Sequence, residues 1–149
     1  GAFLGAITSA TATHKVGLHA EIFLCAACRE TESRDDLIEN EQCAMPVAER
    51  AQSLANHLRA SAEKHGIAMQ VNQIGSLLCP YFTETPVNCY AAAKKSDTKR
   101  YAAYFNGMLK RGIYLAPSQF EAMFVSSVHT QNDLACTVQA AEETLSEMA

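Results

Sequence analysis

No stretch of this sequence is apolar for long enough to cross a membrane. The longest candidate, residues 21–28, is far shorter than the ~20 apolar residues that a spanning helix needs. The sequence also lacks a charged start followed by an apolar segment and a cleavage site. We therefore predict neither a membrane span nor an export signal.

An excess of positive charge is absent as well. The formal net charge is −4, and the basic residues of segment 94–100 are offset by Asp97 and by acids elsewhere. Proteins that bind nucleic acid usually present a basic surface to the phosphate backbone. We therefore expect no nucleic-acid partner.

A second closely spaced cysteine pair is the third absence. Cys25 and Cys28 have the spacing of a zinc knuckle or a redox dithiol, but zinc needs further ligands, and His14, His19 and Cys43 do not stand at comparable spacing. The six cysteines are scattered through a chain that can bury a core without disulfides. We expect reduced, buried or incidental thiols in a cytoplasmic protein and no metal site. Whether Cys25 and Cys28 bind anything stays open.

The chain divides into two unequal parts. Residues 1–45 show no clear period and are predicted as a segment of uncertain structure and role. From Pro46 onward each segment has a recognisable pattern, so residues 46–149 are expected to form one small domain. Pro46 suits the first turn of an amphipathic helix, and Gly66 supplies its left-handed stop.

Two neighbouring strands are predicted next. Residues 68–73 alternate between polar and apolar, and residues 76–82 are apolar and bounded by turn residues. Pro80 has no N–H to donate, which places it at an edge or an irregularity. Gly75 is interpreted as a bulge or as a point of close backbone approach.

A second helix follows, capped by Ser96 or Asp97 and ended by Gly112. Its predicted buried face consists of Tyr101, Tyr104, Phe105, Met108 and Leu109.

The remaining elements complete an α+β fold. Residues 113–115 and 123–128 are candidate strands, and a capping box with an Asp in place of the usual Glu opens a final helix at Thr130. Some links between strands are tight turns and others are whole helices. We therefore predict a sheet of three to four mostly antiparallel strands with helices packed on one face.

Three segments carry a resemblance to a known family. They read VNQIGSLLCPYFTETPV (71–87), YAAAKKSDTKRYAAYFNGMLKRG (90–112) and GMLKRGIYLAPSQFEAMFVSSVHT (107–130). In order and spacing they resemble the C-terminal part of the glutamate-1-semialdehyde 2,1-aminomutases, which belong to the class III pyridoxal-phosphate aminotransferases. The resemblance covers roughly residues 46–148.

The resemblance implies a fold, an activity and partners. It implies the small C-terminal domain of a fold type I enzyme that converts glutamate-1-semialdehyde, an amino-aldehyde, to 5-aminolevulinate in tetrapyrrole (porphyrin) biosynthesis. Pyridoxal phosphate or pyridoxamine phosphate would be held mainly by a large domain that this chain lacks, and the complete enzyme would be a homodimer. Its expected location is the cytoplasm, or the plastid stroma in a plant or alga.

The family forms an internal aldimine through a lysine in a context resembling Asp-Lys-Val-Ile-Gly-Gly-Gly. None of the lysines here stands in such a context: Lys15, Lys64, Lys94, Lys95, Lys99 and Lys110. We therefore predict no catalytic and no cofactor-binding residue in this chain, no covalently bound cofactor, and an inactive protein when it is alone. The chain is expected to be a natural fragment, or a truncated or frame-disrupted product.

Three residues are nevertheless candidates for contact with the active site. Glu121 matches a family position that projects from the small domain, where a carboxylate could orient the substrate or a gating basic residue; the alternative is a surface acid after a turn. Ser118 and Gln119 are candidates for donating hydrogen bonds to the substrate, with turn capping as the alternative for Ser118. His129 is interpreted as a satisfied neutral histidine and not as a catalytic base.

Two other functions stay open. The chain could belong to another class III aminotransferase, although the runs 93–97 and 118–121 favour the aminomutase. It could also be a stand-alone, non-catalytic binding domain of the same fold.

Overall fold

A β-hairpin forms the centre of the fold. The computed structural model describes residues 41–149, with strands β1 (Gln70–Ile74) and β2 (Leu77–Tyr81) paired antiparallel. Gly75 lies in the two-residue link between them with φ +54°. A Cβ at this position would meet no atom within 4 Å. Gly75 therefore serves the turn itself, through its positive φ, and the predicted bulge or close backbone approach is wrong.

A short third strand completes the sheet. Strand β3 (Met123–Phe124) pairs antiparallel with β2, opposite Leu77 and Leu78, which gives the order β1-β2-β3. Pro80 is in β2 beyond the reach of β3, so its missing N–H leaves no gap in that pairing. Pro80 is nevertheless in the middle strand and in continuous register with β1, so the predicted placement at an edge or an irregularity is not confirmed.

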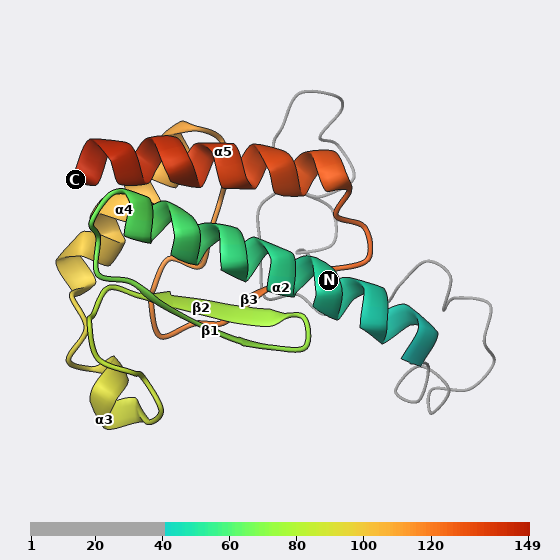
Figure 1. The fold of residues 1–149 in the computed structure, drawn as a ribbon, viewed down its shortest axis with the longest axis horizontal. Helices are drawn as coiled ribbons and strands as arrows, with labels where there is room; N and C mark the ends of the chain where they lie inside the picture. Colours follow the sequence, from blue (N-terminus) through green and yellow to red (C-terminus); the bar gives the residue numbers. More distant parts are fainter. Residues whose placement is uncertain (1–40) are drawn as a thin grey trace, which may run out of the picture.

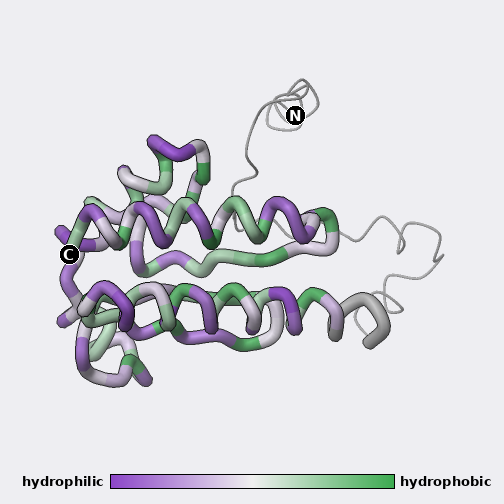
Figure 2. Tube along the Cα trace, turned by 45° about the horizontal axis from the view of Figure 1, so that its top comes forward, coloured by the Kyte–Doolittle hydropathy of each residue, from purple (hydrophilic) through white to green (hydrophobic). Residues whose placement is uncertain are grey.

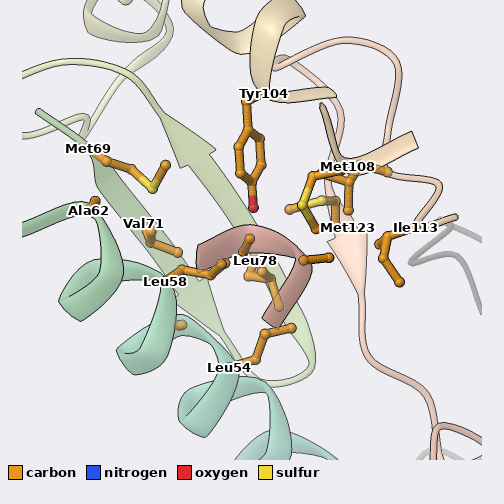
Figure 3. Close-up of a cluster of buried hydrophobic side chains, with 14 of the residues drawn as sticks. Leu54, Leu58, Ala62, Met69, Val71, Leu78, Tyr104, Met108, Ile113 and Met123 are labelled. Atoms are coloured by element: carbon orange, nitrogen blue, oxygen red, sulfur yellow. The ribbon is translucent and has the colours of Figure 1, made fainter. Parts of the chain in front are cut away.

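Helix α2 (Glu41–Lys64) covers one face of this sheet (Figure 1). Its side chains Leu54 and Leu58 point toward Val71 of β1 and Leu78 of β2 (Figure 3), and all four are at most 4% exposed. The core buries one face of the hairpin because side chains alternate along a strand. The helix also contains residues 41–45. Pro46 therefore lies inside the helix, and its predicted position in the first turn is wrong.

Two further helices enclose the core from the same side. Helix α4 (Thr98–Lys110) contributes Tyr104 and Met108, which are 1% and 0% exposed, and α5 (Gln131–Met148) runs beside α2 (Figures 1 and 3). Apolar and polar residues alternate turn by turn along the helices (Figure 2), as expected when one face of each is buried. The four-residue helix α3 (Tyr90–Ala93) lies on the opposite side of the sheet (Figure 1).

The helix ends follow the predicted chemistry. Asp97 accepts hydrogen bonds from the amides of Lys99 and Arg100 at 2.9 and 3.0 Å. Thr130 and Asp133 form the reciprocal capping box at the start of α5. Gly66 and Gly112, with φ of +65° and +77°, follow the ends of α2 and α4. No helix among residues 41–149 is both long and apolar enough to traverse a bilayer.

Two predicted strands differ from the structure. Residues 113–115 form no strand, although Ile113 and Leu115 are each 1% exposed. The segment alternates because Ile113 and Leu115 are buried in the core while Tyr114 is 38% exposed. The amide of Ile113 donates to the carbonyl of Met108 at 2.9 Å. The candidate strand 123–128 shortens to the two residues of β3. Three strands therefore stand within residues 41–149, while the division of the chain at residues 45 and 46 stays a prediction.

The outer edge of β1 is partly covered by an arginine. Strand β1 is the outer strand in the order β1-β2-β3. The carbonyl of Val71 accepts a hydrogen bond from the guanidinium of Arg59 on α2. This contact joins the helix to the sheet at its edge.

The crossing of α4 and α5 generates a stability prediction. A Cβ built on Gly107 would clash with Cγ2 of Thr144, which is itself 1% exposed. Gly107→Ala should therefore destabilise the chain by about 1–3 kcal/mol through overpacking, despite the helix preference for Ala of roughly 0.5–1 kcal/mol. Urea unfolding of the two proteins measures the difference.

The control for that prediction is Thr144→Ser, which removes the clashing methyl group and keeps the hydroxyl that bonds to the carbonyl of Ala140. Added to Gly107→Ala, it should restore part of the lost stability. A Gly107→Ala variant more stable than the parent would show that the two helices do not touch closely here.

An ion-pair cluster generates a pH prediction. The Glu142 carboxylate lies 2.9 Å from Nε2 of His65 and also pairs with Lys64. Hydrogen bonds from Lys64 first, then from Ser61 and His65, lower the pKa of Glu142 from 4.5 to about 2. Because this pKa is depressed in the folded state, the stabilisation is present above about pH 4.5 and is lost as the pH falls toward about 2.

Thermal unfolding across that window should show Glu142→Gln losing less stability on acidification than the parent. Glu63→Gln is the matched control, since Glu63 is exposed and has no ion pair with any residue in the range 41–149. If the melting temperatures of the parent and of Glu142→Gln fell equally as the pH is lowered, the prediction would be contradicted.

Candidate functional site

The predicted site residues lie together in one turn between Pro117 and β3. The turn contacts the sheet on the face away from α2: Cys79 follows Leu78 in β2, so its side chain points to the opposite face, and its Sγ donates to the carbonyl of Glu121 at 3.5 Å. The site is therefore on the side of the hairpin that the core does not use.

The turn is closed by its own atoms. The amide of Glu121 donates to the carbonyl of Ser118 at 3.1 Å, and the amide of Phe120 donates to Oγ of Ser118 at 3.2 Å. Ser118 is half-buried and Glu121 is exposed. The turn-capping alternative for Ser118 is thus present in the structure, and a contact between its hydroxyl and a substrate stays a prediction.

Gln119 anchors the turn from inside. Its side chain is 3% exposed, and Nε2 donates to Oγ of Ser96, at the junction of α3 and α4, over 3.0 Å. Among residues 41–149, Oε1 has no hydrogen-bond partner. A buried acceptor left in this state costs about 1–3 kcal/mol. The candidate donor role of Gln119 toward a substrate stays a prediction, but the amide is enclosed in this structure.

An exposed aromatic pair borders the turn. The rings of Tyr90 on α3 and Phe120 have centroids 6.1 Å apart at an angle of 58°, although these residues are 70% and 46% exposed. The ammonium of Lys94 lies 5.7 Å from the centre of the Tyr90 ring. Glu121 directly follows Phe120 in the chain, so its backbone lies next to this apolar and partly cationic surface.

The titratable groups behind the turn are held neutral. Burial raises the pKa of the Cys79 thiol, against opposing hydrogen bonds from Tyr81 and the backbone of Met123. Burial also raises the pKa of Tyr101, whose hydroxyl donates to the carbonyl of Ala116 at 2.6 Å. Neither group is ionised near neutral pH, so the exposed carboxylate of Glu121 is the one charge that this turn carries.

His129 sits elsewhere, before α5, and is 6% exposed. Its Nδ1 accepts from the amide of Ser126 at 2.9 Å, which in the neutral ring leaves the proton on Nε2. Its carbonyl accepts from Arg50 of α2 at 3.1 Å. These contacts agree with a structural histidine that fixes the link between β3 and α5.

Two other predictions concern metals and thiols. No group of three or more metal-ligating side chains occurs in the described part of the chain. Cys25 and Cys28 lie outside the described residues. Cys79, Cys89 and Cys136 are free thiols.

Sequence reasoning missed two parts of this site. The helix α3 is a single turn whose side chains do not show a period, so Tyr90 was not placed beside Phe120. The sequence offers Ser96 or Asp97 as the helix cap; Asp97 takes that role, and Oγ of Ser96 accepts a hydrogen bond from Gln119. Neither contact has a local signal, because the partners are separated by 23 residues or more along the chain.

Curated relatives share one name. The chain is 52% identical over 101 residues to the glutamate-1-semialdehyde 2,1-aminomutase of Ruminiclostridium cellulolyticum, covering 68% of this chain and 23% of the relative. It is 49% identical over 98 residues to that of Deinococcus radiodurans, covering 64% and 22%. The chain therefore spans about a quarter of the length of these relatives. No protein-family model matches it.

Solved structures show the same fold. A glutamate-1-semialdehyde aminomutase from Pseudomonas aeruginosa PAO1, solved in complex with PMP, superposes with a TM-score of 0.68 at 18% identity, covering 78% of this chain and 26% of that one. A β-phenylalanine aminotransferase from Variovorax paradoxus gives 0.62 at 26% identity, covering 68% and 23%. In sequence this chain matches the C-terminal part of the glutamate-1-semialdehyde 2,1-aminomutases, and its fold is that of the small C-terminal domain of a fold type I pyridoxal-phosphate enzyme.

Proposed function

We propose that this chain is the C-terminal part of an enzyme that isomerises glutamate-1-semialdehyde to 5-aminolevulinate in tetrapyrrole (porphyrin) biosynthesis. The observation that carries the proposal is the 52% identity over 101 residues to a relative of that name. In this proposal the chain supplies one wall of the active site, built on the turn at residues 117–121, and the nitrogen moves within one molecule of substrate.

The cofactor of the complete enzyme would be pyridoxal or pyridoxamine phosphate, which supplies an electron sink when bound. In support of a cofactor held elsewhere, none of the described lysines stands in the sequence context of the family's aldimine lysine: Lys64, Lys94, Lys95, Lys99 and Lys110. We therefore assign the cofactor to the large domain, which lies in the three quarters of the relatives that this chain does not cover.

The contribution of this chain is positioning. Three hydrogen bonds within or onto the turn fix its backbone, so the Glu121 carboxylate is presented from a rigid support. It can accept a hydrogen bond from a substrate amine or hold a gating basic residue. The Tyr90 and Phe120 rings beside it can exclude water when the large domain closes over them, which strengthens such contacts. Dimerisation through the large domain and a location in the cytoplasm or plastid stroma complete the proposal.

A second candidate function is that of another class III aminotransferase, which transfers nitrogen between two molecules. The observation behind it is that a β-phenylalanine aminotransferase shares the fold, with a TM-score of 0.62 at 26% identity. The two functions differ in stoichiometry, because an intermolecular enzyme needs both an amino donor and an amino acceptor. A stand-alone binding domain would need neither.

The proposal predicts that a hybrid enzyme containing part of this chain is active. Residues 46–149 should replace the corresponding part of the Ruminiclostridium cellulolyticum relative, and the hybrid should make 5-aminolevulinate from glutamate-1-semialdehyde without an added amino donor. A requirement for a second amino compound would favour the other aminotransferases, and a folded, cofactor-loaded hybrid without any turnover would favour the binding domain.

Within that hybrid, Glu121→Gln should lower kcat/KM by on the order of 10-fold to 100-fold, because a positioned charge is lost. The cofactor absorbance should not change, since the large domain holds the cofactor. Glu84→Gln is the control, as Glu84 lies in an exposed loop. Full activity of Glu121→Gln would remove this residue from the mechanism.

The chain of 149 residues by itself is expected to form no product. Titration with pyridoxal phosphate followed by borohydride reduction should leave no single lysine stoichiometrically modified, as judged by peptide mass spectrometry. Specific reduction onto one lysine, surviving competition with free lysine, would overturn the assignment of the cofactor to the large domain.

A further inference from the structure

A directed chain of hydrogen bonds ends at the turn that presents Glu121. The hydroxyl of Ser96 has a single proton, which it donates to the carbonyl of Ala93. Toward Gln119, Ser96 Oγ must therefore accept, and the Gln119 amide must present Nε2 to it, as the 3.0 Å contact has it. The orientation of the amide is thus fixed by chemistry, with Oε1 directed away from Ser96.

This arrangement is poorly suited to stability alone. Gln119 and Ser96 are 3% and 5% exposed, and Oε1 has no partner among the described residues. An apolar side chain of similar size would fill the same space without leaving a buried acceptor unpaired. What the amide adds is a directional link from the turn to the junction of α3 and α4.

We infer that Gln119 and Ser96 act as one unit of positioning residues, which holds the turn so that the Glu121 carboxylate meets the substrate or its gate; the inference rests on the proposed function. Glu121 is two residues from Gln119, and its carbonyl is held from the other side by Cys79 at 3.5 Å. The turn is therefore held between two anchors, one on the sheet and one on the helical junction.

The test uses the hybrid enzyme described above, with Gln119→Met, Ser96→Ala and both together. Each single substitution should lower kcat/KM by about 10-fold through a misplaced carboxylate. The double variant should lose no more than either single one, because both break the same link. Gln119→Met should leave the melting temperature unchanged or raised.

The control is Thr137→Val on α5, which removes another buried side-chain hydrogen bond, from Oγ1 to the carbonyl of Asp133. It should leave kcat/KM unchanged. Full activity of Gln119→Met, losses that multiply in the double variant, or a fall in melting temperature that parallels the loss of activity would each overturn the inference.

A second measurement separates this inference from the proposed function. In the chain of 149 residues, Gln119→Met and Ser96→Ala should each speed amide hydrogen exchange at Phe120 and Glu121 by about 10-fold or more, without changing exchange in α5. If the unmodified hybrid is inactive, the proposed function fails while faster exchange still supports the anchor. Unchanged exchange at these amides would refute the anchor regardless of activity.

Discussion

Burial of helix α2 on two sides is the constraint on which the other elements depend. One side of the helix covers the β1-β2 hairpin, and another packs along α5 (Figure 1). A hairpin alone is at best marginally stable in water, so this sheet exists because α2 removes one of its faces from solvent. Ala51, Ala55 and Ala62, each at most 1% exposed, let the neighbouring backbones come close without loss of packing density.

The same packing decides where the candidate site can be. Leu78 points into the core and Cys79, the next residue, points to the other face, so a single strand joins the two environments. One face is dry and rigid, and the other carries the turn, the aromatic pair and the carboxylate. The turn is attached to a strand that the core holds in place, so the site is rigidly supported although some of its residues are exposed.

Local chemistry was readable from the sequence, and long-range pairing was not. Asp97, Thr130 with Asp133, Gly66 and Gly112 each act within four residues of themselves, so the helix ends could be predicted correctly. Segment 113–115 was misjudged because alternation marks any extended segment with one buried side, whether or not another strand lies beside it. Glu121 was found through a resemblance, whereas the contacts of Gln119 and Tyr90 required the folded chain. Those contacts depend on how distant segments pack in the folded chain, and no periodic pattern in the sequence predicts them.

Arg59 has a bearing on how this small sheet behaves in a crowded solution. Strand β1 is at the end of the order β1-β2-β3, and an uncovered strand of this kind is a template on which foreign strands can add. The Arg59 guanidinium occupies the carbonyl of Val71, one of the backbone groups with which a foreign strand would pair, and it places a positive charge beside the strand. One side chain of the covering helix thus joins α2 to the sheet and also discourages self-association at the outer strand.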